Sequence, residues 1–66
     1  MDDATQRRLH ADQLLADLRA RGPRSPRMIE AVPPDGMTAK QTRVAMQQLI
    51  DEGKAGLDEQ LRLAVV

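Results

Sequence analysis

The chain has 66 residues, no cysteine, no aromatic residue and a formal net charge of zero. This length allows a single domain, 1–66, and the lack of cysteine excludes disulfides and thiolate metal sites. Without aromatic rings, recognition of single-stranded nucleic acid by base stacking is not expected. No apolar run approaches the roughly 18 residues that span a bilayer, and the start MDDATQRRLH lacks the apolar core of a signal peptide. We therefore expect a soluble, cytoplasmic protein that has no membrane partner.

The charges are distributed unevenly along the chain. Residues 1–18 carry a net charge of −2, residues 19–43 carry +4 and residues 44–66 carry −2. Because a charged ligand responds to the local potential and not to the sum, this basic centre is compatible with phosphate binding. A solvated, arginine-rich loop without a ligand is the alternative interpretation.

The first predicted element is a helix over roughly residues 4 to 21. Its apolar residues recur at helical spacing and are Ala4, Ala11, Leu14, Leu15 and Leu18. Arginines close the segment, which suits the negative end of a helix dipole. Gly22 and Pro23 then end the helix.

A second, short helix is predicted between Ser25 and the proline pair at 33–34. Ser25 can cap the free amides, and Pro26 suits the first helical position because its missing N–H costs nothing there. The apolar stripe of this helix consists of Met28, Ile29 and Val32. Residues 34–36, Pro-Asp-Gly, favour a tight turn. Two helices joined by such a turn make a candidate helix-turn-helix.

The third predicted helix begins at Thr38, which forms a capping box with Gln41, and ends at Gly53 in a left-handed cap. The residues expected to face the core are Thr42, Ala45, Met46, Leu49 and Ile50. The other side carries Lys40, Arg43, Val44, Gln47 and Gln48. The cations lie in the first turns and two acids in the last, against the preference of the helix dipole. Positive charge at a helix start is what an approach to phosphates or guanine edges requires.

After Gly53 the apolar period changes from 3.6 to two. Ala55 and Leu57 alternate, Asp58 and Glu59 supply a turn, and the returning segment alternates Leu61, Leu63 and Val65. This pattern predicts a β-hairpin whose apolar face covers the helices. The expected fold class is therefore mostly α with a small β-hairpin. An uncovered strand from Leu61 to Val66 would also be an edge for a second copy.

The run from Thr38 through Leu57 has the pattern T-x3-T-x2-A-M-x2-L-x3-G-x3-L. It resembles the recognition helix and first wing strand of bacterial winged helix-turn-helix regulators. The resemblance implies a fold of three helices plus a two-stranded wing, with Met46 and Leu49 in the core. It implies groove-facing roles for Lys40, Gln41, Arg43 and Gln47.

These observations predict a double-stranded DNA-binding transcriptional regulator, such as a small bacterial or phage protein, with the helix at about 38–52 in the major groove. The residues expected at bases or phosphates of the groove are Lys40, Gln41, Arg43 and Gln47. The residues expected on the DNA backbone are Arg24, Arg27 and Lys54. A homodimer through the C-terminal strand is also expected, because a lone domain makes few contacts.

The alternative is a protein–protein interaction module on the same fold, such as a small phage protein that binds a host factor. Acidic residues 58–59 occupy the predicted wing tip, where DNA-binding winged-helix domains commonly carry Arg or Lys. Zero net charge also suits a protein partner. The single histidine, His10, has no predicted nucleophile or partner, and no spacing matches a phosphate-binding loop. We therefore expect neither enzymatic activity nor a cofactor.

Overall fold

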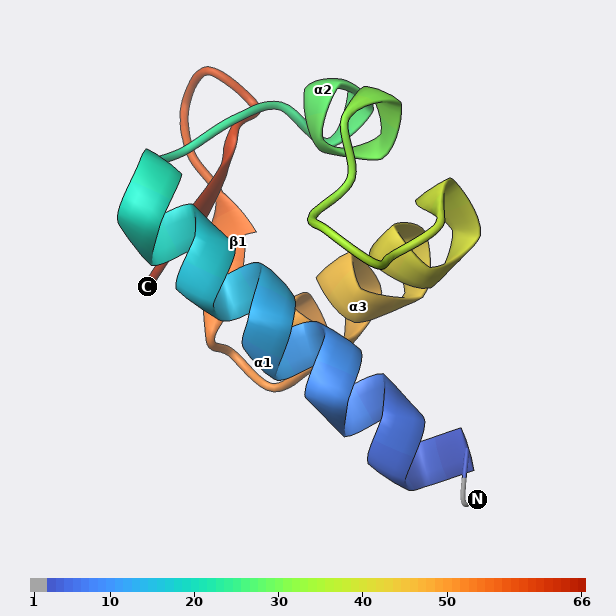
Figure 1. The fold of residues 1–66 in the computed structure, drawn as a ribbon. Coiled ribbons are helices and arrows are strands. Elements are labelled where there is room, and N and C mark those ends of the chain that lie inside the picture. Colours follow the sequence, from blue (N-terminus) through green and yellow to red (C-terminus); the bar gives the residue numbers. More distant parts are fainter. Residues whose placement is uncertain (1–2) are drawn as a thin grey trace.

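The computed structural model describes residues 3–66 and contains three helices followed by an antiparallel hairpin (Figure 1). The elements are α1 (Asp3–Arg21), α2 (Pro26–Ala31), α3 (Ala39–Asp51), β1 (Ala55–Leu57) and β2 (Leu63–Val65). The expected class, mostly α with a small β-hairpin, is confirmed, and the order of elements is compatible with a winged-helix layout. None of these helices is long and apolar enough to cross a membrane.

One hydrophobic core joins the helices to the hairpin. The helices contribute Ala11, Leu14, Leu15 and Leu18 of α1, Ile29 of α2, and Ala45, Met46 and Leu49 of α3. Met37 comes from the loop before α3, and Ala55 and Leu63 come from the hairpin. The packing of α1 against α3 is the most extensive contact between elements. Thr42 is also fully buried, and its hydroxyl donates a hydrogen bond to the carbonyl of Thr38 at 2.8 Å. That bond offsets the cost of burying a polar group.

The predicted helix ends are confirmed. Ser25 Oγ accepts the amide of Met28 at 3.2 Å and caps α2. At the start of α3, Thr38 Oγ1 accepts the amide of Gln41 at 3.1 Å, and Gln41 Oε1 accepts the amide of Thr38 at 2.9 Å. Gly53, with a φ of +72°, follows the end of α3 in the left-handed conformation that few other residues adopt cheaply.

Four residues of the predicted helices that were expected on apolar core faces are exposed instead, and these predictions were wrong. They are Ala4, Met28, Val32 and Ile50. Because α2 has only six residues, just one of its side chains, Ile29, reaches the core. Ile50 follows Leu49 by a rotation of about 100° around α3, which places it at the margin of the buried face with 39% of its surface exposed.

The second strand begins later than predicted, at Leu63 and not at Leu61. The carboxylate of Asp58 accepts the amides of Gln60 and Arg62, both at 2.9 Å, so the turn occupies more residues than the expected pair. Leu61 lies within this turn with a φ of +60° and is 67% exposed. The hairpin therefore covers the core with Ala55 and Leu63. Leu57 and Leu61 were predicted on the same apolar face but are exposed, so this part of the prediction was wrong.

The connector between α1 and α2 runs beside the hairpin. Arg24 pairs with Leu63 in an antiparallel bridge, through backbone bonds of 3.3 Å and 2.7 Å. This bridge occupies the outer side of β2 at Leu63. The pairing of the C-terminal strand with a second copy stays a prediction, restricted to the residues that follow Leu63.

Candidate nucleic-acid interface

The outer face of α3 is a stripe of exposed side chains opposite the core. It consists of Lys40, Val44, Gln47 and Asp51, which recur at spacings of three and four residues. Burial of Thr42 and Leu49 on the opposite side orients the stripe toward solvent. The outer face lies between two surface hollows, one against α1 and the other against α2 and the hairpin.

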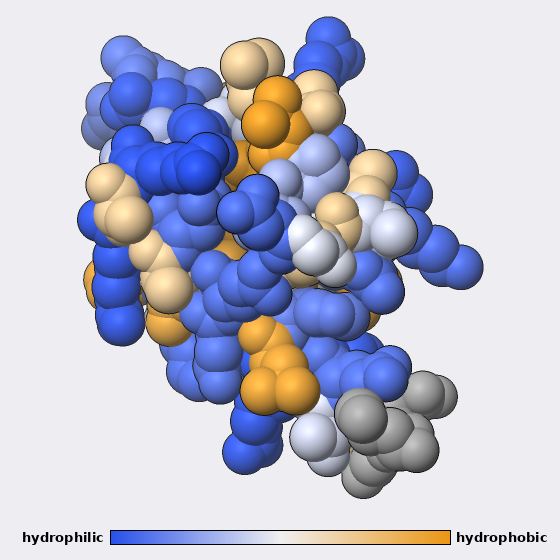
Figure 2. All heavy atoms as spheres, viewed as in Figure 1, coloured by the Kyte–Doolittle hydropathy of each residue, from blue (hydrophilic) through white to orange (hydrophobic). Residues whose placement is uncertain are grey.

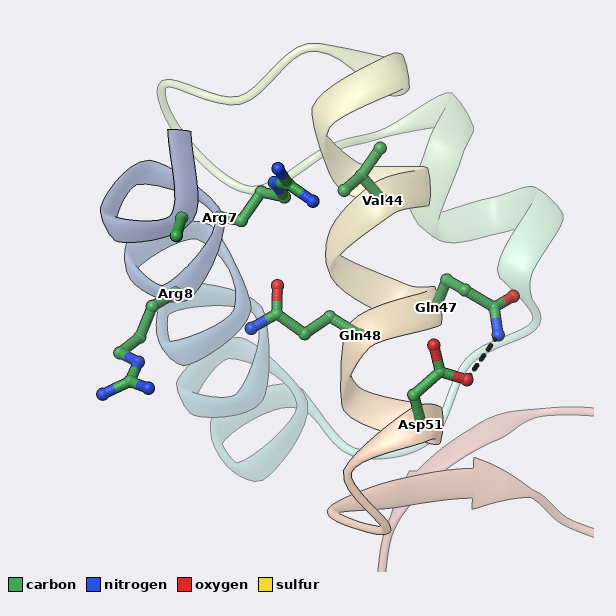
Figure 3. Close-up of a pocket in the computed structure, with 7 residues that line it drawn as sticks. Arg7, Arg8, Val44, Gln47, Gln48 and Asp51 are labelled. Carbon is green, nitrogen blue, oxygen red and sulfur yellow. Dashed lines mark hydrogen bonds between the residues drawn. The ribbon is translucent and has the colours of Figure 1, made fainter. Parts of the chain in front are cut away.

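On the α1 side, two adjoining concavities of about 480 and 510 Å³ share Arg7 and Val44. We call them together the α1–α3 groove. In Figure 3, Arg7 reaches from α1 toward α3 and Gln48 reaches from α3 toward α1, whereas Arg8 points away from α3. Lys40 and the half-buried His10 line the other end of the groove.

The α1–α3 groove carries an excess of positive charge. Within residues 4–66, Arg7, Arg8 and Lys40 form no ion pair; the ion pairs there belong to other cations. The one acid that lines the groove among these residues is Asp51, which accepts a hydrogen bond from Gln47 Nε2 at 2.9 Å (Figure 3). An anion bound in the groove would therefore not have to displace a carboxylate of residues 4–66 from these cations.

Arg7 and Arg8 were not among the site residues predicted from the sequence, since they belong to the segment with a net charge of −2. The helical spacing does contain a signal for Arg7. It precedes Ala11 by four residues and Leu14 by seven, so it continues the face of α1 that packs on α3. An arginine at the outer end of such a face faces the neighbouring helix.

On the other side of α3, a hollow of about 260 Å³ separates α2 from the hairpin. We call it the apolar hollow, because most of its lining is apolar and consists of Pro26, Met46, Ile50, Leu57 and Leu63. Glu30, Arg43 and Gln47 complete it. Arg43 Nε lies 2.6 Å from Glu30 Oε1, so this side carries a neutralised charge pair.

The four groove-facing residues predicted on α3 have different surroundings. Lys40 is exposed and unpaired within the described chain, whereas Gln41 is half-buried and belongs to the capping box. Arg43 is paired with Glu30, and Gln47 is bonded to Asp51. Both of these contacts are exposed, so solvent or a ligand can replace them.

The three residues predicted on the DNA backbone differ in their surroundings. Arg27 is exposed on α2, and Lys54 Nζ lies 3.5 Å from a carboxylate oxygen of Glu52. Arg24 is held in an ion pair with Asp17, and only 22% of its side chain is exposed. Its placement indicates a structural role.

The face seen in Figure 2 is mostly hydrophilic, with small, separate apolar patches. No group of three or more metal-binding side chains occurs among the described residues. Comparisons with protein-family models, with curated proteins and with solved structures gave no match for this chain. Its function must therefore be argued from its own geometry.

Proposed function

We propose that this domain is a winged helix-turn-helix protein that binds double-stranded DNA in transcriptional control, with the outer face of α3 in the major groove. One observation carries the proposal. The helix α3 has 13 residues and is about 20 Å long, and its solvent-facing stripe begins with the cation Lys40. The stripe lies beside Arg7 of α1, which forms no ion pair within residues 4–66. The major groove of B-form DNA is about 12 Å wide and admits one α-helix.

The side chains of the outer face suit base edges. Gln47 carries an amide that can pair with adenine, and Val44 offers an apolar surface for the methyl group of thymine. Lys40 can donate to guanine or to phosphate. The bond from Gln47 to Asp51 is exposed, and such a pair four residues apart on a helix surface stabilises the helix by only about 0.2 to 0.5 kcal/mol. A base edge can therefore take its place.

Arg43 is available to DNA despite its ion pair with Glu30. Its side chain is 71% exposed, and an exposed ion pair of this kind contributes roughly 0 to 1 kcal/mol. A phosphate oxygen or the edge of a guanine offers the guanidinium a partner of similar or greater strength. Arg43 thus stays in the proposed contact set together with Lys40 and Gln47.

The proposal includes a homodimer, because a lone domain of this size makes few DNA contacts. The outer side of Leu63 is bonded to Arg24, and the amide of Val66 is bonded to the carbonyl of Lys54 at 3.1 Å, so the C-terminal strand would pair with a second copy through the backbone of Val65. Val66 is highly exposed. Analytical sedimentation of the protein with and without DNA would measure its oligomeric state. A single protein chain on a saturated duplex would contradict this part of the proposal.

A protein-interaction module is the second candidate function, and the apolar hollow favours it. Ile50 and Leu57 expose much of their surface there, beside a charge pair that is already neutralised. Exposed apolar surface that is rimmed by polar groups is typical of protein–protein contact sites. Zero net charge is equally compatible with this function.

The test is binding to mixed genomic DNA fragments at two salt concentrations. A cationic DNA contact must weaken steeply with salt, because each neutralised phosphate releases counterions. Absence of binding at low salt would overturn the DNA proposal and favour the protein module. A variant with Arg43→Ala and Gln47→Ala should lose its preference among sequences while keeping its helical circular dichroism. Equal loss of binding to every sequence would argue against base reading.

A further inference from the structure

We infer that the α1–α3 groove receives the phosphate backbone of the bound duplex, with Arg7 of α1 and Lys40 of α3 as phosphate contacts from its two walls. This inference rests on the proposed function and adds α1 to the interface. The α1 side of α3 then provides the stronger phosphate contacts.

The groove brings cations from two helices together. Arg7 lines both of its concavities and points toward α3 (Figure 3), and Lys40 lines the concavity at the start of α3. Val44 lies in both concavities, so the two cations flank an apolar surface that does not compete for a phosphate. Both cations are exposed and have no ion pair within residues 4–66, so binding of a phosphate breaks no ion pair in this part of the chain.

The opposite side of α3 is less suited to a phosphate. There the carboxylate of Glu30 faces the apolar hollow together with Arg43, and the rest of the lining is mostly apolar. A phosphate in that position would be repelled by Glu30 and would lose hydration without gaining an unpaired cation. The α1 side of α3 therefore offers the stronger phosphate contacts.

Charge-neutralising variants of the whole domain test this inference. Arg7→Gln and Lys40→Gln each remove one proposed phosphate contact. The matched control is Arg19→Gln, because Arg19 is also exposed on α1. It lies twelve residues further along the helix, about 18 Å from Arg7, and lines neither the α1–α3 groove nor the apolar hollow. Dissociation constants are measured on one duplex at several salt concentrations and on a second duplex of different sequence.

Each groove variant should bind about eightfold more weakly at 0.1 M salt, because the loss of one phosphate contact lowers the slope of log K against log salt by about 0.9. The loss should be the same on both duplexes, since phosphates carry no sequence information. Arg19→Gln should bind as the unaltered protein does. Arg7→Lys should restore most of the affinity, which separates charge from any effect of Arg7→Gln on folding.

The outcomes separate this inference from the proposed function. Absence of DNA binding by the unaltered protein overturns the function itself. DNA binding that Arg7→Gln weakens no more than Arg19→Gln does leaves the function intact and overturns the inference. Competition with linear polyphosphate identifies the ligand: a duplex site is displaced only at a large excess of phosphate groups. Equal competition per phosphate would mean that the groove takes any polyanion, which also overturns the inference.

Discussion

Arg24 and Leu63 exchange two backbone hydrogen bonds, which tie the connector between α1 and α2 to the second strand of the hairpin. The guanidinium of Arg24 is at the same time bound to Asp17 of α1. One residue thus links a helix, a connector and a strand that are distant in sequence. An arginine that the charge pattern favoured as a phosphate ligand therefore has a structural role in this fold.

Replacing Asp17 with Ala should lower the free energy of unfolding by about 1 to 3 kcal/mol, because it leaves the partly buried guanidinium of Arg24 without its carboxylate. The Nε of Arg24 already has no hydrogen-bond partner among the described residues. Arg21→Ala is the matched control, since Arg21 binds the same carboxylate but is 61% exposed, and should change stability by less than about 0.5 kcal/mol. Urea denaturation measures both, and equal effects would contradict the structural role of Arg24.

Leu61 and Leu63 should respond in opposite directions to substitution. Leu63 is fully buried, so Leu63→Ala should cost about 2 to 5 kcal/mol of stability. Leu61 has a positive φ and a mostly exposed side chain, so Leu61→Gly removes backbone strain and should stabilise the fold by up to about 1 kcal/mol. Thermal unfolding of the two variants checks this, and a large loss on Leu61→Gly would show that the side chain packs in solution.

The parts of the fold that follow from neighbouring residues could be predicted from the sequence. The caps at Ser25 and Thr38 and the stop at Gly53 involve partners within a few positions, and all three are confirmed. The predictions that were wrong concern residues whose structure depends on tertiary contacts. Leu61 has the right period for a strand, but the bonds of Asp58 to the amides that surround it hold it in the turn.

In the candidate site, too, the features set by local sequence could be predicted and those set by tertiary contacts could not. The outer face of α3 follows from helical spacing, so Lys40 and Gln47 lie where they were predicted. Arg7 enters the site only because α1 packs beside α3, and Arg43 meets Glu30 across thirteen positions of sequence. Such contacts between residues distant in sequence depend on how the helices pack, so they cannot be predicted from the charge of each segment.

Acid should loosen the turn of the hairpin through Asp58. The pKa of Asp58 lies below its ordinary value, mainly because the backbone amide of Arg62 donates a hydrogen bond to the Asp58 carboxylate. The amide of Gln60 and the side chain of Arg62 donate further bonds that lower it. A carboxylate whose pKa is lowered in the folded state stabilises that state at pH values above its unfolded pKa, which is about 3.9. This contribution is lost as the pH falls through the lower, folded value.

Nuclear magnetic resonance can follow this titration. The carboxyl carbon of Asp58 and the amides of Gln60 and Arg62 should shift together, with a midpoint below that of a short peptide containing the same aspartate. Asp58→Asn keeps an oxygen acceptor for the two amides and should remove the acid-dependent shifts. A midpoint equal to that of the peptide would contradict the bonding seen at the turn.

Glu30→Gln should strengthen the proposed DNA binding. The substitution removes the carboxylate beside Arg43 and leaves its guanidinium free for a phosphate or a base, at a cost in stability of at most about 1 kcal/mol. The slope of log K against log salt should steepen, by about 0.9 if Arg43 gains one phosphate contact. Asp12→Asn is the matched control, because it changes the net charge equally at an exposed position of α1 outside all three hollows. Equal gains in the two variants would mean that overall charge, and not the release of Arg43, determines affinity.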